Sequence, residues 1–366
     1  MDSPARSLVH GFRLPRSVFL GVVLAGLAAA ATACSSNGNS GSTGAAIGAG
    51  TSANAQEAQY EKVVKAVLPS VVQISAGNST GSGVVYDSKG DIVTNAHVIG
   101  SATSAMVRVP VDDKQVDARV VGEFTPDDLA VIRVNSDATD LKPASWANSA
   151  DAQVGQIVLA MGNPLGLTDS VTQGIISATG RTVGEAASSS DGSAGGSALI
   201  TSAIQTSAAI NPGNSGGALV TLGDQVIGIP TLAARLPGEG GAAPGIGFAI
   251  PSNTVKNIAG QLIKDGKVTS SGRASLGITG ETAVNSADDP IGVGVVSTTA
   301  GGTAANAGVH TGDVIVGLNN TKTPTIEALQ AVLASLKPGS KVTIHYLPGG
   351  TGAEKTGSAK LDSLSS

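Results

Sequence analysis

Short apolar segments separated by turn residues run through most of the chain, and they limit its possible folds more than any other feature. Between residues 71 and 250 the chain contains, among others, VVQIS, SGVVY, DIVTN, LAVIRV, QIVLAMG, ALVTL and GIGFAI. Gly, Asp, Asn or Pro stands between successive segments. This spacing is typical of an all-β sandwich or barrel. We therefore expect a mainly β architecture for this part of the chain.

Two helical patterns enclose the β-rich region. EKVVKAVLPS predicts a short helix that ends at Pro69, and PSNTVKNIAGQLIKDGKV predicts a closing helix that stops at Gly266. Strands around SLGIT, GVGVVST, DVIVGLN and KVTIHYL, with a helix near IEALQAVLASL, indicate a second, smaller α+β unit. A chain of 366 residues has room for two folded domains. We assign residues 60–268 to the first domain, 274–347 to the second, and 348–366 to a disordered tail.

The N-terminus has the features of an export signal. Basic residues precede an apolar run over residues 18–33, which is shorter than a comfortable membrane span and ends in small residues. ATAC, residues 31–34, resembles a bacterial lipobox, in which the cysteine, here Cys34, is lipidated and becomes the mature N-terminus. We therefore interpret residues 1–33 as a lipoprotein-like export signal. Cleavage by a general signal peptidase and retention as a short transmembrane anchor are the alternatives.

All three interpretations place the rest of the protein outside the cytoplasm, at the outer face of the cytoplasmic membrane or in the cell envelope. Residues 34–59 are rich in Ser, Gly, Ala and Asn, and we expect them to form a flexible tether. Because Cys34 is the only cysteine, no intrachain disulfide framework is expected.

Charge and motif content exclude several classes of function. Lys and Arg number 22 against 27 Asp and Glu, and no basic block interrupts the folded region, which argues against a nucleic-acid partner. The sequence has no metal-spaced His/Cys cluster and no phosphate-cradling motif. We therefore expect no metal and no cofactor.

A serine surrounded by glycines is the strongest candidate for chemistry. Ser215 lies in NPGNSGGAL, where glycines permit a tight turn and a close approach of the backbone. A serine nucleophile needs a base, which is most often a histidine. His10, His310 and His345 lie outside the β-rich domain, so His97 in DIVTNAHVI is the only candidate base there. The alternatives are an ordinary SGG turn and a histidine hydrogen-bonded at a strand end.

An aspartate that orients the histidine should be buried. EFTPDDLAVIRV offers Asp127 and Asp128, and Asp128 leads directly into an apolar strand. Asp128 is therefore the better candidate, and we interpret Asp127 as a solvated loop residue. The other aspartates nearby have turn-like polar surroundings and are interpreted as surface charges: Asp112, Asp113 and Asp117.

Taken together, TNAHVI, DDLAVI, GNPLG, INPGNSGGAL and GIGFAIPSN resemble the HtrA/Deg family of trypsin-like serine proteases, in an exported bacterial form. The resemblance covers about residues 63–347. It implies a chymotrypsin-like double β-barrel with the catalytic cleft between two six-stranded barrels, followed by a smaller α+β PDZ domain. It also implies that His97 is the general base, Asp128 the orienting carboxylate and Ser215 the nucleophile.

The same resemblance implies how the serine loop and its surroundings act. Gly213, Asn214 and Ser215 would form the turn whose backbone N–H groups make the oxyanion hole. The strand VIGIP would line the cleft and pair with an extended peptide. We assign substrate binding to four small or aliphatic positions, Ala209, Ile210, Gly228 and Ile229. Since no acidic residue stands where a trypsin-type pocket needs one, we expect a preference for small or medium aliphatic residues.

Two positions depart from the family pattern. Ser207 stands where many relatives have an aspartate, which raises the question of whether the activation loops are held in the usual way. Leu165 replaces the frequent Phe of GNPFG in the loop that accompanies activation.

In the second domain, SLGI resembles the loop that receives a peptide carboxylate in PDZ domains. We assign peptide binding to Ser275, Leu276, Gly277 and Ile278. Ile326 and Leu329 would line the other wall of the groove, and the ligands would be peptides with apolar free C-termini. The alternative is a satellite domain in which Leu276 and Ile278 only fill the core.

These observations lead us to expect an exported, envelope-attached serine endopeptidase. It would cleave misfolded or processed envelope proteins through an acyl-enzyme, in protein quality control and the stress response. The resemblance adds the expectation of a homotrimer. A chaperone or scaffold whose protease site rests in an inactive state is the main alternative, and a purely structural lipoprotein is another.

Overall fold

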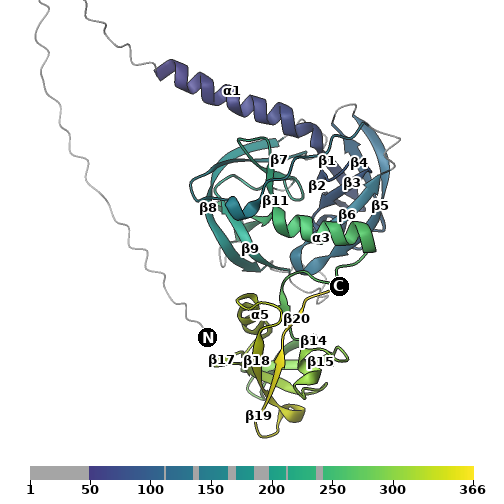
Figure 1. Ribbon diagram of the computed structural model, residues 1–366, viewed down its shortest axis with the longest axis vertical. Coiled ribbons are helices and arrows are strands. Elements are labelled where there is room, and N and C mark those ends of the chain that lie inside the picture. Colours follow the sequence, from purple (N-terminus) through teal and green to yellow (C-terminus); the bar gives the residue numbers. More distant parts are fainter. Residues whose placement is uncertain are drawn as a thin grey trace, which may run out of the picture. The chain divides into compact units, whose positions relative to one another are not determined.

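The computed structural model describes residues 49–110, 113–134, 140–163, 170–184, 198–211, 213–235 and 242–366. Residues 49–366 form one compact unit, which Figure 1 shows as two barrels followed by a smaller domain. The predicted export signal and Cys34 lie outside the described residues.

Six antiparallel strands close into the first barrel in the order β1-β2-β3-β6-β5-β4. Their bounds are β1 Val71–Ala76, β2 Ser79–Val85, β3 Asp91–Thr94, β4 Ser104–Val109, β5 Lys114–Phe124 and β6 Leu129–Val134. The barrel interior is filled by aliphatic side chains such as Val72, Ile74, Ile92 and Ile132, each with no exposed surface. A four-residue helix, α2 Ala96–Ile99, follows β3 directly.

The second barrel repeats this architecture in the order β10-β11-β12-β9-β8-β7. Its strands are β7 Ile157–Gly162, β8 Ser170–Gly184, β9 Leu199–Thr206, β10 Ala218–Thr221, β11 Val226–Arg235 and β12 Ala242–Pro251. Aliphatic residues again fill the interior, among them Val158, Ile176 and Leu219. Each sheet closes on itself, so every strand of a barrel pairs with a neighbour on both sides over at least part of its length.

A further apolar core joins the two barrels to two helices. The helix α3 Ser252–Asp265 places Val255, Ile258 and Leu262 on one face, at helical spacing, and all three are fully buried. This cluster contains residues of both barrels, and Figure 1 shows α3 crossing them. The helix α1 Ala49–Val67 joins the same cluster through Val63 and Val67. The two barrels therefore share one continuous apolar support.

The second domain is a small sheet with two helices. Its elements are β13 Ala274–Ser275, β14 Ile278–Val284, β15 Pro290–Thr298, α4 Thr303–Asn306, β16 Val314–Leu318, β17 Thr321–Lys322, α5 Ile326–Ala334, β18 Lys341–Leu347, β19 Lys355–Lys360 and β20 Asp362–Ser363. The main sheet has the order β14-β15-β16-β18-β19. Two barrels followed by an α+β domain confirm the predicted fold class.

Two predicted flexible segments are partly regular. The predicted tether, residues 34–59, is helical from residue 49. Ala, Gln and Glu have high helix propensity, so the segment forms a helix although its exposed residues show no apolar periodicity. The predicted disordered tail is wrong: β19 pairs with β18 along its whole length, from Lys341↔Lys360 to Tyr346↔Lys355. The strand is mostly exposed, so it lacks the apolar alternation that marks a half-buried strand.

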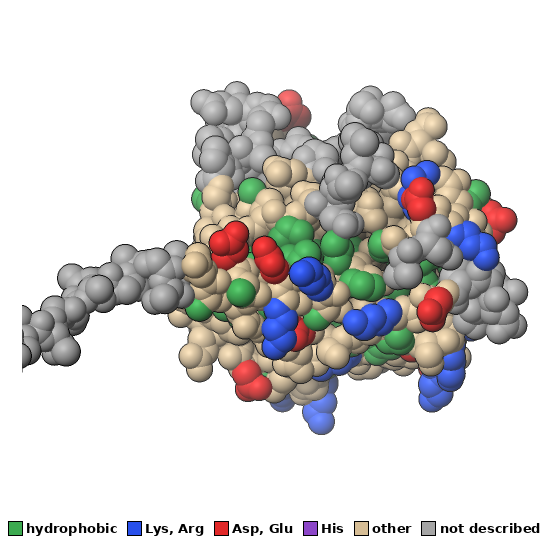
Figure 2. Space-filling view, turned by 90° about the horizontal axis from the view of Figure 1, so that it is seen from above, with side chains coloured by type: hydrophobic (Ala, Val, Ile, Leu, Met, Phe, Trp, Pro, Cys, Tyr) green, Lys and Arg blue, Asp and Glu red, His purple; other side chains and the backbone are tan. Residues whose placement is uncertain are grey.

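Charges of both signs are mixed on the face that Figure 2 draws, where Lys and Arg side chains alternate with Asp and Glu. In the described part of the chain, no helix combines the length and the apolar character needed to span a membrane.

Candidate active site

His97 is held by a buried carboxylate. It lies in α2, where the chain leaves β3, and its side chain is 37% exposed while that of Asp128 is 3% exposed. The ring Nδ1 lies 2.9 Å from Asp128 Oδ2. The backbone N–H of His97 also donates to Asp128 Oδ1, at 3.0 Å. Both carboxylate oxygens therefore contact the same residue, which fixes the orientation of the imidazole ring.

Asp128 occupies an unusual backbone position. It follows a 3-10 turn, Thr125–Asp127, and has a left-handed φ of 51°, which Asp tolerates better than most residues. The carbonyl of Asp128 accepts from Asn95 Nδ2 at 2.9 Å and from the backbone N–H of Ala96 at 3.2 Å. The turn before β6 is thus tied to the start of α2.

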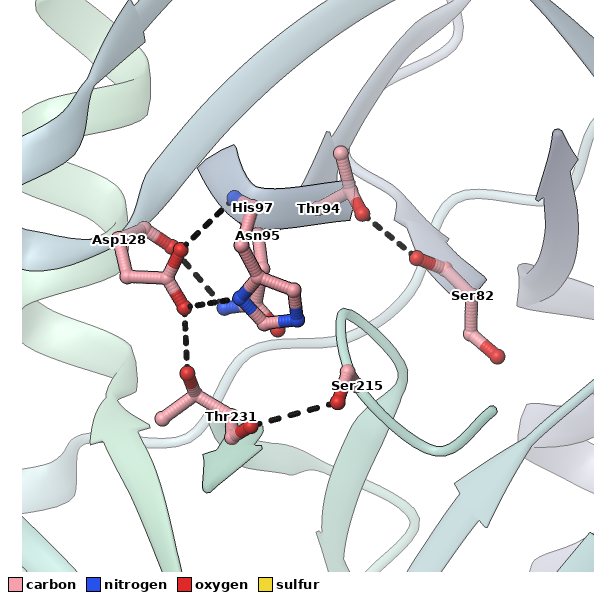
Figure 3. Close-up of polar contacts among 7 residues, drawn as sticks. All are labelled: Ser82, Thr94, Asn95, His97, Asp128, Ser215 and Thr231. Carbon is pink, nitrogen blue, oxygen red and sulfur yellow. Dashed lines mark hydrogen bonds and ion pairs between the residues drawn. The ribbon is translucent and has the colours of Figure 1, made fainter. Parts of the chain in front are cut away.

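Thr231 is a site residue that the sequence interpretation missed. Its hydroxyl donates to Asp128 Oδ2, and its carbonyl accepts from Ser215 Oγ at 3.3 Å (Figure 3). The side chain belongs to β11 and is buried. The only signal in the sequence was its place directly after VIGIP. Thr231 therefore links the carboxylate to the serine loop.

The loop around Ser215 requires glycines at defined positions. Gly213 has a φ of 104°, in the region that favours glycine. At Gly216, a Cβ would lie 2.2 Å from the carbonyl oxygen of Ser82, which no side chain could accommodate. These close approaches explain why one serine lies among several glycines.

The backbone of this loop leaves two N–H groups for a ligand. Asn214 N–H donates to Asn211 O, and Gly217 N–H donates to Asn214 O, both at 3.0 Å. Among the described residues, none accepts from the N–H of Gly213 or of Ser215. The side chain of Asn214 is buried and donates to Ala209 O at 3.3 Å, so it braces the loop.

Asp127 is not the solvated residue that we expected. Only 2% of its side chain is exposed, and Oδ1 accepts from Arg273 Nη1 at 2.8 Å. The same nitrogen donates to Pro126 O at 2.7 Å. Burial raises the pKa of Asp127, and the attraction of Arg273 opposes that rise only in part. The expectation failed because the residue that covers Asp127 lies far away in the sequence.

Two of the four substrate-binding assignments are wrong. Gly228 pairs with Leu219 on one side and with Pro251 on the other, so no edge is left there for a peptide. Ile229 has no exposed surface and lies in the apolar core. Ile210 is also buried, whereas Ala209 is exposed. At Gly228 the closed barrel uses both edges of β11, which the sequence alone did not reveal.

Ser207 supports its loop with a hydroxyl. Its Oγ accepts from the backbone N–H of Ile175 at 3.0 Å, and its own N–H donates to Ile175 O at 3.1 Å. Leu165, the other departure from the family pattern, lies outside the described residues.

A cavity of about 790 Å³ lies along the predicted groove of the second domain. Ser275, Leu276, Ile278, Ile326 and Leu329 are among the residues that line it. Gly277 has a φ of 65°, and its N–H donates to Ser275 Oγ at 3.0 Å, which shapes the SLGI loop. Leu276 is 1% exposed and belongs to the core, so it also fulfils the packing role that we considered as the alternative.

Two closed six-stranded barrels, in which His97 contacts the buried Asp128 and Thr231 links Asp128 to Ser215, have the architecture of the chymotrypsin-like serine proteases. Residues 81–229 match the family described as a trypsin-like peptidase domain, and residues 273–356 match the PDZ domain. The chain belongs to the HtrA family of serine proteases.

The relatives include curated proteins and solved structures. Serine protease PepD of Mycobacterium tuberculosis is 37% identical over 311 residues, which cover 81% of this chain and 64% of that protein. Serine endoprotease DegS of Escherichia coli is 35% identical over 308 residues, covering 78% and 81%. The crystal structure of the serine endoprotease from Yersinia pestis is 33% identical, covers 83% of this chain and 98% of its own, and has a TM-score of 0.55. The chain spans 64% of PepD and 54% of periplasmic serine endoprotease DegP of Escherichia coli, the first curated relatives that it matches.

Proposed function

We propose that this chain is a serine endopeptidase that hydrolyses peptide bonds through an acyl-enzyme. The hydroxyl of Ser215 attacks the scissile carbonyl while His97 takes its proton and then delivers it to the leaving amine. Asp128 holds the ring and stabilises the imidazolium that forms. This proposal rests on the 2.9 Å contact between His97 Nδ1 and Asp128 Oδ2. In the view of Figure 3, the His97 ring lies between Asp128 and Ser215.

The oxyanion of the tetrahedral intermediate would bind to the N–H groups of Gly213 and Ser215. One such donor contributes about 3 kcal/mol to the stability of a transition state. The peptide itself would pair with β11 beyond Pro230, since the β10 partner of β11 ends at Gly228 and the later residues pair with β12 alone among the described strands. This places the substrate next to Thr231, whose carbonyl faces Ser215 Oγ.

Hydrolysis of casein by the purified protein tests the mechanism. Ser215→Ala and His97→Ala should each lower activity by about 10³-fold to 10⁶-fold, and the double variant should lose little more, since the triad acts as one unit. His345→Ala, in the second domain, is the matched histidine control and should stay active. Substantial turnover by Ser215→Ala would reject the mechanism. An inactive wild type that still prevents aggregation of a denatured protein would favour the chaperone alternative.

We also propose that the protein works outside the cytoplasm, attached to the envelope through a lipid on Cys34, and cleaves misfolded or processed envelope proteins. The basic start, the apolar run of residues 18–33 and the ATAC sequence support export and lipidation. Mass spectrometry of the mature N-terminus tests this: Cys34→Ala should abolish acylation. An unmodified, uncut N-terminus with unchanged membrane retention would indicate a transmembrane anchor instead.

The PDZ domain would bind peptides that end in an apolar residue with a free carboxylate. The 790 Å³ cavity beside the SLGI loop and α5 supports this ligand, because its aliphatic lining suits an apolar terminal side chain. Calorimetry should give micromolar affinity, about −8 kcal/mol, for such a peptide and much weaker binding for its C-terminal amide. Equal affinities would contradict carboxylate capture.

A homotrimer is the assembly that the family resemblance suggests. Light scattering of the region that begins at residue 49 should give three times the mass of one chain. A monomer at the concentration used for the peptidase assay would reject this assembly as a requirement for activity.

A further inference from the structure

Ser82 lies where the first barrel meets the serine loop of the second barrel. It belongs to β2, has no exposed surface, and pairs with Gln73 of β1. Its carbonyl accepts from Thr94 Oγ1 at 2.7 Å (Figure 3), so the neighbouring strand β3 also holds it in place. The position of Ser82 is thus set by the barrel that carries His97.

Ser82 contacts the serine loop on both sides of Asn214. Its hydroxyl donates to Gly213 O at 2.5 Å, and its backbone N–H donates to Ser215 O at 2.9 Å. The hydroxyl also accepts from the backbone N–H of Asn163 at 2.8 Å. Because that N–H can only donate, the single proton of the hydroxyl is directed to Gly213 O.

These bonds fix every carbonyl of the loop from residue 213 to residue 215. Ser82 supplies the donors for Gly213 O and Ser215 O, and Gly217 N–H supplies the donor for Asn214 O. In a trans peptide unit the C=O and N–H point in opposite directions. Holding the carbonyl of Asn214 therefore also directs the N–H of Ser215 away from it.

Gly213 is the point at which this loop could change shape. Glycine tolerates both signs of φ, so its peptide units can rotate at low cost unless something holds them. With a φ of 104°, Gly213 stays in a conformation that the hydroxyl of Ser82 secures from outside the loop. Without this hydrogen bond, the half-buried carbonyl of Gly213 would lose its donor, and the loop would be free to settle in another arrangement.

We propose that Ser82 is a positioning residue for catalysis: from the first barrel it holds the serine loop of the second on both sides of Asn214, so that the N–H of Ser215 stays aimed at the oxyanion. Through its bond with Asn163, it ties this arrangement to the end of β7. The inference rests on the proposed endopeptidase function and adds a residue that the family resemblance did not assign.

The substitution Ser82→Ala tests it, because it removes the hydroxyl and keeps the backbone N–H. The expected result is a fall in kcat of about 10-fold to 100-fold with KM nearly unchanged, since an oxyanion contact acts in the transition state. Affinity for a peptide boronic acid, which mimics the tetrahedral intermediate on Ser215, should fall by a similar factor. Ser79→Ala, at an exposed position of the same strand, is the control and should leave both quantities unchanged.

Three outcomes separate the possibilities. A wild type that neither hydrolyses peptides nor binds the boronic acid rejects the proposed function, and this role with it. An active wild type whose folded Ser82→Ala variant keeps kcat and boronic-acid affinity within about twofold rejects the positioning role alone. If urea titrations show that Ser82→Ala is not folded, Ser82→Cys replaces it, because a thiol is similar in size to a hydroxyl and is only a weak donor. Unchanged boronic-acid affinity in folded Ser82→Cys would then overturn the role.

Discussion

Asp128 is the residue on which most of the hydrogen bonds of the site converge. His97 contacts both of its carboxylate oxygens, Thr231 donates to Oδ2, and Asn95 donates to its carbonyl. A buried carboxylate is costly unless such donors satisfy it. The orientation of His97 therefore depends on Asp128 and on the side chains that hold Asp128 in place.

Replacing Thr231 by valine should show how much its hydroxyl contributes. The volume stays nearly constant, but Asp128 Oδ2 loses a donor in a buried site. Hydrogen bonds to charged groups contribute about 1.5 to 3 kcal/mol, so kcat/KM should fall by about 10-fold to 100-fold. Thr231→Ser keeps the hydroxyl and should remain close to wild type in the same peptidase assay. Equal activity of the valine and serine variants would contradict this role.

At the scale of elements, an ion pair between a buried aspartate and a half-buried arginine joins two neighbouring strands of the first barrel. Asp91 of β3 and Arg133 of β6 are direct cross-strand partners. Arg133 Nε and Nη2 donate to the two carboxylate oxygens at 2.6 and 2.7 Å. Asp91 has no exposed surface, so the arginine supplies the charge that its carboxylate needs. The strand that leads to His97 thus depends on β6.

Removing one partner of this pair should destabilise the first barrel strongly. Arg133→Met leaves the carboxylate of Asp91 buried without its cation, and such changes cost about 3 to 5 kcal/mol. Urea unfolding measures the loss. The double variant Asp91→Val/Arg133→Met leaves no uncompensated charge, so it should recover much of the stability that Arg133→Met loses. A double variant less stable than Arg133→Met would indicate that packing, and not charge, dominates.

At the scale of the whole molecule, Arg273 joins the start of the region that matches the PDZ domain to the turn before Asp128. The turn is Thr125–Asp127, and the buried Asp127 Oδ2 has no hydrogen-bond partner among the residues that the structure describes. Pro126 and Arg273 also line the cavity that lies along the predicted groove of the PDZ domain. Contacts of the second domain therefore reach the backbone next to Asp128, the carboxylate that holds His97.

The raised pKa of Asp127 predicts the pH dependence of this contact. Burial is the larger cause, and Arg273 opposes it, so the folded protein binds this proton more tightly than the unfolded chain does. Stability contributed by Asp127 is therefore greatest below its unfolded pKa and is lost as pH rises through the folded pKa. Relative to wild type, Asp127→Asn should gain stability in urea titrations as pH rises above the ordinary carboxyl pKa of 3.8 and through the raised pKa of the folded protein.

Arg273→Met provides the second arm of that experiment. Without the guanidinium, the pKa of Asp127 should rise further, and the loss of stability should extend to higher pH. If the difference in unfolding free energy between Asp127→Asn and wild type did not change with pH, this would contradict a raised pKa for Asp127. In either case Asp265→Asn, at the exposed end of α3, is a control carboxylate that should change little.

The sequence by itself determined the features that depend on neighbours along the chain. The succession of short apolar segments gave the mainly β fold, the glycines around Ser215 indicated a constrained turn, and the apolar strand after Asp128 indicated its burial. Each of these patterns acts over a few residues, so composition and spacing are enough. They also placed His97 and Ser215 in one domain.

Only the tertiary structure decided which distant groups meet. Barrel closure used both edges of β11 at Gly228, and Arg273 covered Asp127 from a position far along the chain. Thr231 reached Asp128, and Ser82 reached the loop of Ser215 from the other barrel. Hydrogen bonding and burial depend on distance in space, and a polar residue carries the same letter in the sequence whether solvent or a buried partner surrounds it.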